Sequence, residues 1–378
     1  MSKIQEVTLY AIGDSRQISL WSNVPYFFAA TLISRGIKVN RVNLSPSPVL
    51  EKIYSWTWWR ILRLFYRKTT HMYFRSLPHF LDVRRRIRRS LREYPSSDAN
   101  IFLTFSFSSA GLGDRPAIQF CDWTYDHYFT YFENRKPDPF ERRSIQREDS
   151  QIEGSDLIFP LFSSVLGEMK MRYKNPNIFH LGNVINAVYE PDERRLLEIK
   201  STSNTLLFIG DAKYREGVLQ LIQAFGMLKE KSPGLVLDIV GMKRSEFEDL
   251  PEGVTCHGYL DKGKEEERAR YYALLERAKV FINTTPKWGA FSATVEAMYH
   301  YTPVIVWPYR EFVETFGEVI DFGAYCESES PKVLCEQVAH VLYHNGHEKL
   351  CIRARESVKH FTWDAYVGNM LKMMEEKL

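Results

Sequence analysis

Several features that would assign this chain to a special class are missing from its sequence. The five cysteines form no CxxC pair, which argues against a disulfide framework or a zinc site and favours a reducing compartment. Only one window of 18 residues, 17–34, is free of charge, and it contains several polar residues and Pro25, so a membrane-spanning helix is not expected. The first residues, MSKIQEVTLY, contain no apolar core of a signal peptide. We therefore expect a cytoplasmic protein that is either soluble or peripheral at the inner face of the membrane.

Internal repeats of a short fixed period and low-complexity tracts are also absent, and the rest of the composition is that of a globular protein. The chain has 378 residues, of which 44% are hydrophobic and 26% are charged. This length exceeds what one hydrophobic core usually supports, so two domains are the default expectation.

Residues 51–92 form an unusually basic and aromatic segment. They contain twelve Lys and Arg against two acids, in a chain of net charge +3, together with nine aromatic residues. Basic heads mixed with amphipathic rings suit the boundary of an anionic membrane. The alternative is an Arg-rich helix that is solvated on one side and packed on the other. Nucleic acid ranks last as a partner, because no recognised binding motif accompanies the arginines.

The order of apolar runs predicts an α/β protein. Strand patterns such as 6–12, 39–44, 205–210 and 235–241 alternate with helical patterns of ten to fifteen residues, which is typical of parallel sheets with helices on both faces. A further strand is expected within 177–191, and residues 192–204 read as a polar connector. We expect two Rossmann-like, doubly wound domains that face a cleft, with ligands at the carboxyl ends of the strands.

The stretch KWGAFSATVEAM, residues 287–298, has the features of an anion site. Gly289 and Ala290 let a ligand approach the main chain, and Ser292 is expected as the N-cap of a helix with Thr294 in its first turn. The unpaired N–H groups and the macrodipole of a helix start favour a phosphate or diphosphate.

A carboxylate and a second loop extend this site. Glu296 lies one turn into the helix and suits a ribose diol, so that phosphate and diol together describe a nucleotide. A plain capped helix with a solvent-facing Glu is the alternative. The loop 208–217, FIGDAKYREG, follows a strand and brings Lys213 and Arg215 to the same edge, although ordinary surface charges explain it equally well.

The C-terminal half resembles the donor domain of retaining glycosyltransferases of the GT-B fold, family 4 type. Five stretches come in the order of that family: LLFIGDAKYREGVLQLIQAF, LVLDIVG, VTCHGYL, YYALLERAKVFINTT and WGAFSATVEAMYHYTPVIV. The tail FTWDAYVGNMLKMMEEKL is similar to the closing helix of the family. The resemblance implies an acceptor-side domain over 1–187 with an insertion at 51–92, a donor domain over 188–360, and a helix over 361–378 that returns to the first domain.

The resemblance also implies roles for residues of the second half. Glu296 takes the second of two family glutamates, which holds the ribose, and Trp288 stands at the first. The family's Arg and Lys of the phosphate loop fall on Asp211 and Glu216, so Lys213 and Arg215 are the nearby substitutes. The expected donor-binding residues are Gly210, Lys213, Arg215, Gly241, Tyr259 at the nucleobase, Trp288, Gly289, Ala290, Phe291, Ser292, Thr294 and Glu296.

The first half is expected to supply the acceptor side. Asp122 falls near a family histidine close to the reacting sugar, where a carboxylate can bind sugar hydroxyls or stabilise positive charge. His127 is a candidate proton shuttle, with a buried structural His as the alternative. Asp126 lies beside it, and Gly13 and Asp14 follow the first strand in a reduced form of the family's glycine-rich turn.

These observations predict a retaining glycosyltransferase that needs no metal and no cofactor beyond its nucleotide-diphosphate sugar. Glu296, Asp122 and His127 are the catalytic candidates, and no DxD metal signature is present. The acceptor is expected to be a glycan or lipid-linked glycan, with residues 52–92 against an anionic membrane. The alternatives are a GT-B-fold sugar-nucleotide epimerase or phosphorylase, or an inactive subunit that binds a glycan or a membrane.

Overall fold

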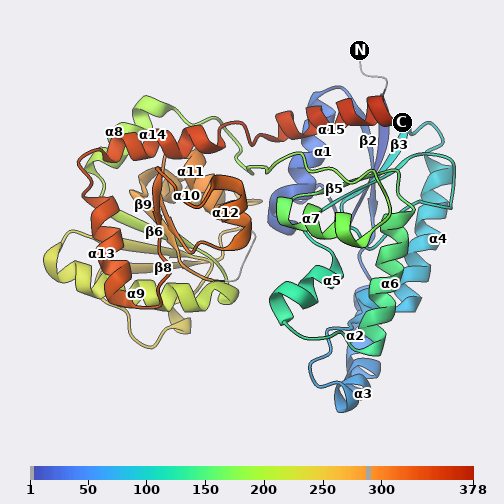
Figure 1. The fold of residues 1–378 in the computed structure, drawn as a ribbon, viewed down its shortest axis with the longest axis horizontal. Helices are drawn as coiled ribbons and strands as arrows, with labels where there is room; N and C mark the ends of the chain where they lie inside the picture. Colours follow the sequence, from blue (N-terminus) through green and yellow to red (C-terminus); the bar gives the residue numbers. More distant parts are fainter. Residues whose placement is uncertain (1–3, 287–290) are drawn as a thin grey trace. The chain divides into compact units, whose positions relative to one another are not determined.

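A computed structural model of the chain describes residues 4–286 and 291–378. It consists of two compact units, Met1–Asn183 with Trp363–Leu378, and Val184–Thr362 (Figure 1). The divisions therefore fall a few residues from the expected 187/188 and 360/361. The prediction of a two-domain α/β protein with parallel sheets is confirmed.

The first unit is built on a five-stranded parallel sheet of order β2-β1-β3-β4-β5. Its strands β3 and β5 are buried along their whole length, as expected for apolar strands covered on both faces. The strand order reverses between β1 and β3, which creates a switch point at the carboxyl ends of these strands. The strands are β1 Glu6–Ala11, β2 Lys38–Asn43, β3 Ala99–Phe102, β4 Ala117–Cys121 and β5 Leu157–Pro160.

Helices cover this sheet, and the last helix of the chain is one of them. Helix α15 packs against α1, where the Phe28 and Trp363 rings meet edge to face at 5.8 Å and Arg35 Nε donates to Asp364 Oδ1 at 2.8 Å. The helices of this unit are α1 Val24–Ser34, α2 Pro48–Trp56, α3 Trp58–Phe65, α4 Leu77–Glu93, α5 Tyr125–His127, α6 Pro139–Glu153, α7 Ser163–Arg172 and α15 Trp363–Lys377, with a 3-10 turn η2 Tyr73–Arg75 and a π-helical turn η3 Tyr128–Glu133.

The basic segment is helical and divides into two parts of different character. Helix α4 buries Val83 and Ile87 and leaves its arginines outside, which is the packed, solvated helix that the sequence allowed as an alternative. Helices α2 and α3 instead expose most of their apolar side chains. None of the helices among the described residues has the length and apolarity needed to cross a bilayer.

The second unit holds a six-stranded parallel sheet of order β11-β10-β9-β6-β7-β8, with its switch point between β6 and β9. Its strands are β6 Thr205–Ile209, β7 Val236–Val240, β8 Val254–Gly258, β9 Val280–Asn283, β10 Val304–Val306 and β11 Gly323–Tyr325. Its helices are α8 Glu193–Thr202, α9 Arg215–Lys231, α10 Glu265–Arg277, α11 Ser292–Tyr299, α12 Arg310–Phe316, α13 Pro331–Leu342 and α14 His347–Val358, with 3-10 turns η4 Ala212–Tyr214 and η5 Arg244–Glu246. Helices α9 and α13 pack against each other beside this sheet.

Two sequence expectations about the joint between the halves were wrong. Residues 193–202 form helix α8 rather than a polar connector, because Asp192 caps the helix and its Leu196 face is buried. The strand expected within 177–191 is reduced to one bridge between Ile158 and Ile178. Gly182 follows with φ +101°, a left-handed conformation that takes the chain out of an extended path.

Candidate functional site

A cavity of about 580 Å³ lies in the first unit at the carboxyl ends of β1, β3 and β4. Ile12 follows β1, residues 103–106 follow β3, and residues 122–125 follow β4, and all of them line the cavity. This is the switch point of the sheet, where doubly wound proteins bind their ligands. The volume is within the range of small-molecule sites.

Asp122, predicted from the sequence as a catalytic residue, lies on the wall of this cavity. Its Oδ1 accepts from the Trp123 backbone N–H at 2.9 Å and from the Cys121 thiol at 3.2 Å. Burial raises the pKa of the Asp122 carboxyl, and these hydrogen bonds partly oppose the rise. The arrangement is a carboxyl group held at the end of a buried strand and turned toward a ligand-sized space.

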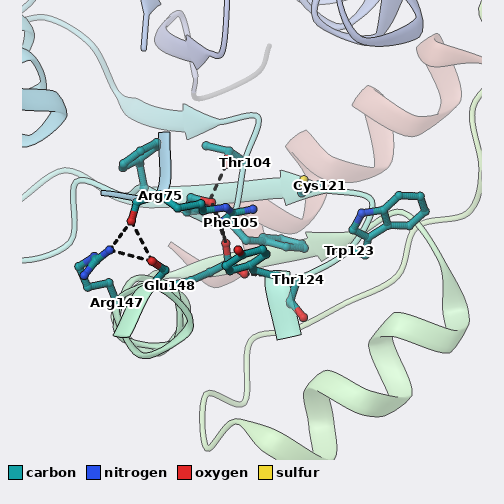
Figure 2. A network of polar contacts seen from close by, with 12 residues as sticks. Arg75, Thr104, Phe105, Cys121, Trp123, Thr124, Arg147 and Glu148 are labelled. Atoms are coloured by element: carbon teal, nitrogen blue, oxygen red, sulfur yellow. Dashed lines mark hydrogen bonds and ion pairs between the residues drawn. The ribbon is translucent and has the colours of Figure 1, made fainter. Parts of the chain in front are cut away.

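A partly buried ion pair that the sequence analysis missed lies on the same wall. Arg75 Nη1 lies 3.0 Å from Glu148 Oε2, and the Ser106 hydroxyl donates to the same oxygen at 2.7 Å (Figure 2). The Arg75 guanidinium also lies 3.8 Å from the centroid of the Tyr125 ring. No sequence signal singled out this pair, since Arg75 is one of many arginines and Glu148 belongs to an ordinary polar helix.

The loop after β1 closes one side of the cavity and is tightly constrained. A Cβ on Gly13, which has φ +108°, would lie 2.5 Å from Leu20 Cδ1, and Leu20 lines the cavity. Trp21, Ser22 and Asn23 follow with φ of 38°, 50° and 74°, a region that L-residues seldom adopt. The absence of a side chain at Gly13 therefore lets Leu20 take its place in the cavity wall. Asp14 instead accepts from the backbone N–H of Arg16 within the loop.

The structure places His127 and Asp126 away from the cavity wall. His127 is buried between the Trp123 and Tyr131 rings, and its Nδ1 lies 2.6 Å from Glu168 Oε2. Asp126 pairs with Arg172 at 2.6 Å. These contacts favour the structural reading of His127 that the sequence analysis left open.

In the second unit, glycines bring the loops at the carboxyl edge of the sheet close together. A Cβ on Gly241, after β7, would lie 2.4 Å from the Gly210 carbonyl oxygen, after β6. A Cβ on Gly217 would lie 2.5 Å from Thr285 Oγ1, after β9. The expected donor residues Gly210 and Gly241 therefore have a packing requirement of their own.

The Arg215 side chain of loop 208–217 is held by this edge. Arg215 Nη1 donates to the Glu246 carbonyl at 2.7 Å, and its guanidinium lies 5.5 Å from the Phe247 ring centroid. The backbone N–H of Lys213 donates to Asp211 Oδ1. Tyr259, the expected nucleobase contact, follows Gly258 at the end of β8 and is 66% exposed.

Glu296 is buried and has internal partners. Lys262 Nζ lies 2.8 and 2.9 Å from its two carboxylate oxygens, and the Tyr271 hydroxyl donates to Oε2 at 2.7 Å. The exposed fraction of Glu296 is 3%, which contradicts the solvent-facing alternative. Burial, and then the charge of Glu296, raises the pKa of Tyr271. Lys262 was missed because a lysine in a polar loop carries no signal in a single sequence. Whether Glu296 holds a ribose stays a prediction.

The start of α11 differs from the prediction. The N-cap is Phe291 rather than Ser292, because the Phe291 ring packs into an aromatic cluster with Tyr309 and Phe312 and fixes the chain one residue earlier. Thr294 is buried in the first turn. The expected contacts of Trp288, Gly289 and Ala290 lie outside the described residues. Within the described ranges, no cluster of three or more His, Cys, Asp or Glu could hold a metal ion.

Two doubly wound parallel sheets in tandem, with candidate binding residues at their carboxyl edges, are the arrangement of the GT-B fold. Residues 190–359 match the family model of glycosyl transferases group 1. The match lies within the second unit, which is therefore similar to a group 1 glycosyltransferase domain. A search of curated proteins finds no match.

Solved structures share the fold over almost the whole chain. Sucrose-phosphate synthase from Thermosynechococcus elongatus has 15% identity and a TM-score of 0.69, with 98% of each chain covered. WaaG, a glycosyltransferase involved in lipopolysaccharide biosynthesis, has 15% identity and a TM-score of 0.64, over 98% of this chain and 99% of WaaG. HepE of Anabaena, solved with UDP and glucose, has 11% identity and a TM-score of 0.63, with the same coverage. At these identities the likeness establishes the fold alone.

Proposed function

We propose that this chain is a retaining, metal-independent glycosyltransferase that moves a sugar from a nucleotide-diphosphate sugar to a hydroxyl of a glycan or lipid-linked glycan. The observation that carries the proposal is the Asp122 carboxyl on the wall of the switch-point cavity of the first unit. A carboxylate there can accept a hydrogen bond from a reacting hydroxyl or stabilise positive charge on the sugar. The group 1 domain supplies the donor side.

For the donor, we assign the diphosphate to the start of α11, with Lys213 and Arg215 at the neighbouring loop, and the ribose to Glu296. The amide groups and the dipole of a helix start stabilise a leaving diphosphate without a metal ion. HepE, which shares the fold, was solved with UDP and glucose, and this supports a nucleotide-sugar donor. Lys262 holds the Glu296 carboxylate in place by a hydrogen bond to Oε1.

For the location, we propose that the α2–α3 surface binds the inner face of a membrane. We define this surface as the exposed apolar residues Val49, Leu50, Ile53, Trp56, Trp58, Ile61, Leu64 and Phe65, with the basic residues Lys52, Arg60, Arg63, Arg67 and Lys68. Trp56, Leu64 and Phe65 are 62%, 79% and 75% exposed. The Arg60 guanidinium lies 4.3 Å from the Trp56 ring centroid, so aromatic and basic groups mix at close range as an anionic interface favours.

A second candidate function is an inactive subunit that binds sugar nucleotide without transfer. The observation in its favour is that the Glu296 carboxylate and the Arg215 guanidinium already have protein partners. A measurement of sugar transfer distinguishes the active glycosyltransferase from the inactive subunit.

The experiment is a thermal-shift screen across UDP, GDP, dTDP and CMP, followed by a transfer assay with sugar nucleotides of the base that stabilises the protein. We expect nucleotide release in the presence of EDTA and a product whose anomeric configuration, read by NMR, matches the donor. Binding without turnover would favour the inactive subunit. Inversion of the configuration or complete loss of activity with EDTA would overturn the corresponding part of the proposal.

A further inference from the structure

The polar side chains around the cavity of the first unit are largely engaged with one another. Arg75, Glu148 and Ser106 form the network described above. The Thr70 hydroxyl lies 2.8 Å from the Tyr125 hydroxyl and 3.0 Å from Glu141 Oε1. Groups that already have protein partners gain little from a ligand, so most of these side chains are structural walls rather than ligand contacts.

Two more lining hydroxyls accept hydrogen bonds from the backbone, and each keeps its O–H donor. Thr124 Oγ1 accepts from the His127 backbone N–H at 3.1 Å, and Thr104 Oγ1 accepts from the Ser106 backbone N–H at 3.1 Å. Asp122 Oδ1 accepts from the Trp123 backbone N–H and from the Cys121 thiol, and the carboxyl group also has a side-chain hydrogen bond with Trp21. A carboxylate has about four acceptor positions, so Asp122 retains capacity for a ligand hydroxyl.

The remaining lining is apolar and aromatic. It is made by Ile12, Leu20, Trp21, Phe74, Leu103 and Trp123, among others. A free oligosaccharide carries a hydroxyl on most of its carbons, and each hydroxyl buried here without a partner would lose its hydrogen bonds to water. A ligand with an apolar body and a single polar attachment matches these walls much better.

Some residues that line the cavity follow the α2–α3 surface directly in the sequence. Thr70, Phe74 and Arg75 belong to the segment that directly follows α3, and they line the cavity. The Tyr54 hydroxyl of α2 lies 2.8 Å from His71 Nδ1, which ties α2 to the same segment. One short stretch of chain therefore connects an exposed apolar, basic surface with an apolar cavity.

We propose that the acceptor of this enzyme is an amphiphile whose apolar part occupies the cavity while its hydroxyl is bound by Asp122. This inference rests on the proposed glycosyl transfer and names its acceptor class. In the reaction, the acceptor hydroxyl oxygen bonds to the anomeric carbon, the bond from that carbon to the diphosphate oxygen breaks, and the hydroxyl proton goes to the leaving diphosphate. Asp122 orients the hydroxyl during this step.

The test compares two ligands that share a sugar head and differ in their apolar part. Binding of n-octyl β-D-glucoside, kept below its micelle concentration, and of methyl β-D-glucoside is measured by calorimetry on the full-length protein. We expect the octyl compound to bind at least about tenfold more tightly, because its chain leaves water on entering the cavity. Equal affinities, or no binding of the octyl compound, would overturn the inference.

Matched variants locate the binding. Ile12→Trp enlarges a side chain that lines the cavity, whereas Ile33→Trp makes the same change on the exposed face of α1. The first should remove the octyl preference and the second should keep it, with melting temperatures as the check on folding. Leu20→Trp repeats the test if Ile12→Trp fails to fold. A preference that survives both cavity variants but is lost in Leu64→Ser/Phe65→Ser would place the binding on the α2–α3 surface and overturn the inference.

The transfer assay separates this inference from the proposed function. Transfer to methyl and octyl glucoside at equal efficiency would leave the glycosyl transfer standing and remove the amphiphilic acceptor. An octyl preference in binding without transfer from any sugar nucleotide would leave the cavity's ligand class standing and remove the proposed function.

Discussion

Single side chains decide what the two candidate sites can do. In the first unit, Asp122 and Glu148 line the cavity, while Asp126 and His127, four and five positions after Asp122, have partners elsewhere. In the second unit, the carboxylate of Glu296 is fixed by Lys262 and Tyr271. The chemistry at each site therefore depends on which neighbour each charged group has, and single substitutions can test it.

Asp122→Asn should lower the rate of transfer by about 100-fold or more, because the amide keeps the size of the side chain but removes the charge. The measurement is nucleotide release with the donor found in the thermal-shift screen. Asp126→Asn is the matched control, since this carboxylate pairs with Arg172 outside the cavity wall, and its rate should stay near that of the original protein. Equal rates for both variants would exclude a role for Asp122 in the reaction.

Lys262→Met and Glu296→Gln should each destabilise the second unit by about 3–5 kcal/mol, because each leaves a buried group of the pair without its partner. The double variant should cost less than the sum of the two, since neither charge then remains alone. Urea unfolding of the four proteins gives the coupling energy. Additive effects would mean that the contact contributes nothing to stability.

His79 makes the stability of the first unit depend on pH. The side chain is fully buried among Tyr73, Phe74 and Phe107, where burial lowers its pKa to about 4. Below pH 6.5 the unfolded chain takes up a proton that the folded chain refuses, so this contribution is present above pH 6.5 and is lost as the pH falls toward 4. At pH 5 we expect this loss to be about 2 kcal/mol.

The variant His79→Phe should remove this loss. Neither ring nitrogen of His79 has a hydrogen-bond partner within the described part of the chain, so a phenyl ring leaves no polar group unpaired. The free energy of unfolding of the variant, relative to the original, should therefore rise as the pH is lowered from 7 to 5. A difference that is constant over this range would show that His79 does not titrate as the buried environment requires.

At the scale of elements, the sequence predicted the strands and helices of both sheets well where the pattern was local. Apolar runs followed by Gly210, Gly241 and Gly258 ended their strands near the expected positions. The N-cap of α11 could not be predicted, because it depends on Phe291 packing against residues more than fifteen positions later. The Arg75–Glu148 and Lys262–Glu296 pairs are likewise contacts between distant segments, which leave no periodic trace in one sequence.

The α2–α3 surface is expected to bind vesicles that contain anionic lipid. Vesicles with anionic lipid should sediment the protein, and the bound fraction should fall with added salt as the attraction to Arg60 and Arg63 is screened. Trp56→Ser/Leu64→Ser/Phe65→Ser should leave the protein mostly in the supernatant. Met171→Ser/Val319→Ser changes apolar side chains of comparable exposure elsewhere and should sediment like the original. Equal sedimentation of both variants would contradict the assigned surface.

At the scale of the whole molecule, the two units are joined by two chain passages, since the last helix belongs to the first unit. Trp363 is buried against Phe28 and Phe120, so Trp363→Ala should destabilise the first unit by about 3–5 kcal/mol. Hydrogen exchange should show faster exchange in β1–β5 and unchanged protection in β6–β11. Trp56→Ala removes an exposed indole and should change neither. Faster exchange in both sheets would show that the units unfold together.

The place of α15 also determines when the first unit can mature during synthesis. Its sheet is translated early, but the helix that covers Phe28 consists of residues 363–377, which emerge only after the entire second unit has been made. Until then, the apolar side chains that α15 contacts, among them Phe28 and Phe120, stay uncovered. Chaperone contacts with these side chains are therefore expected to persist until residues 363–377 have left the ribosome.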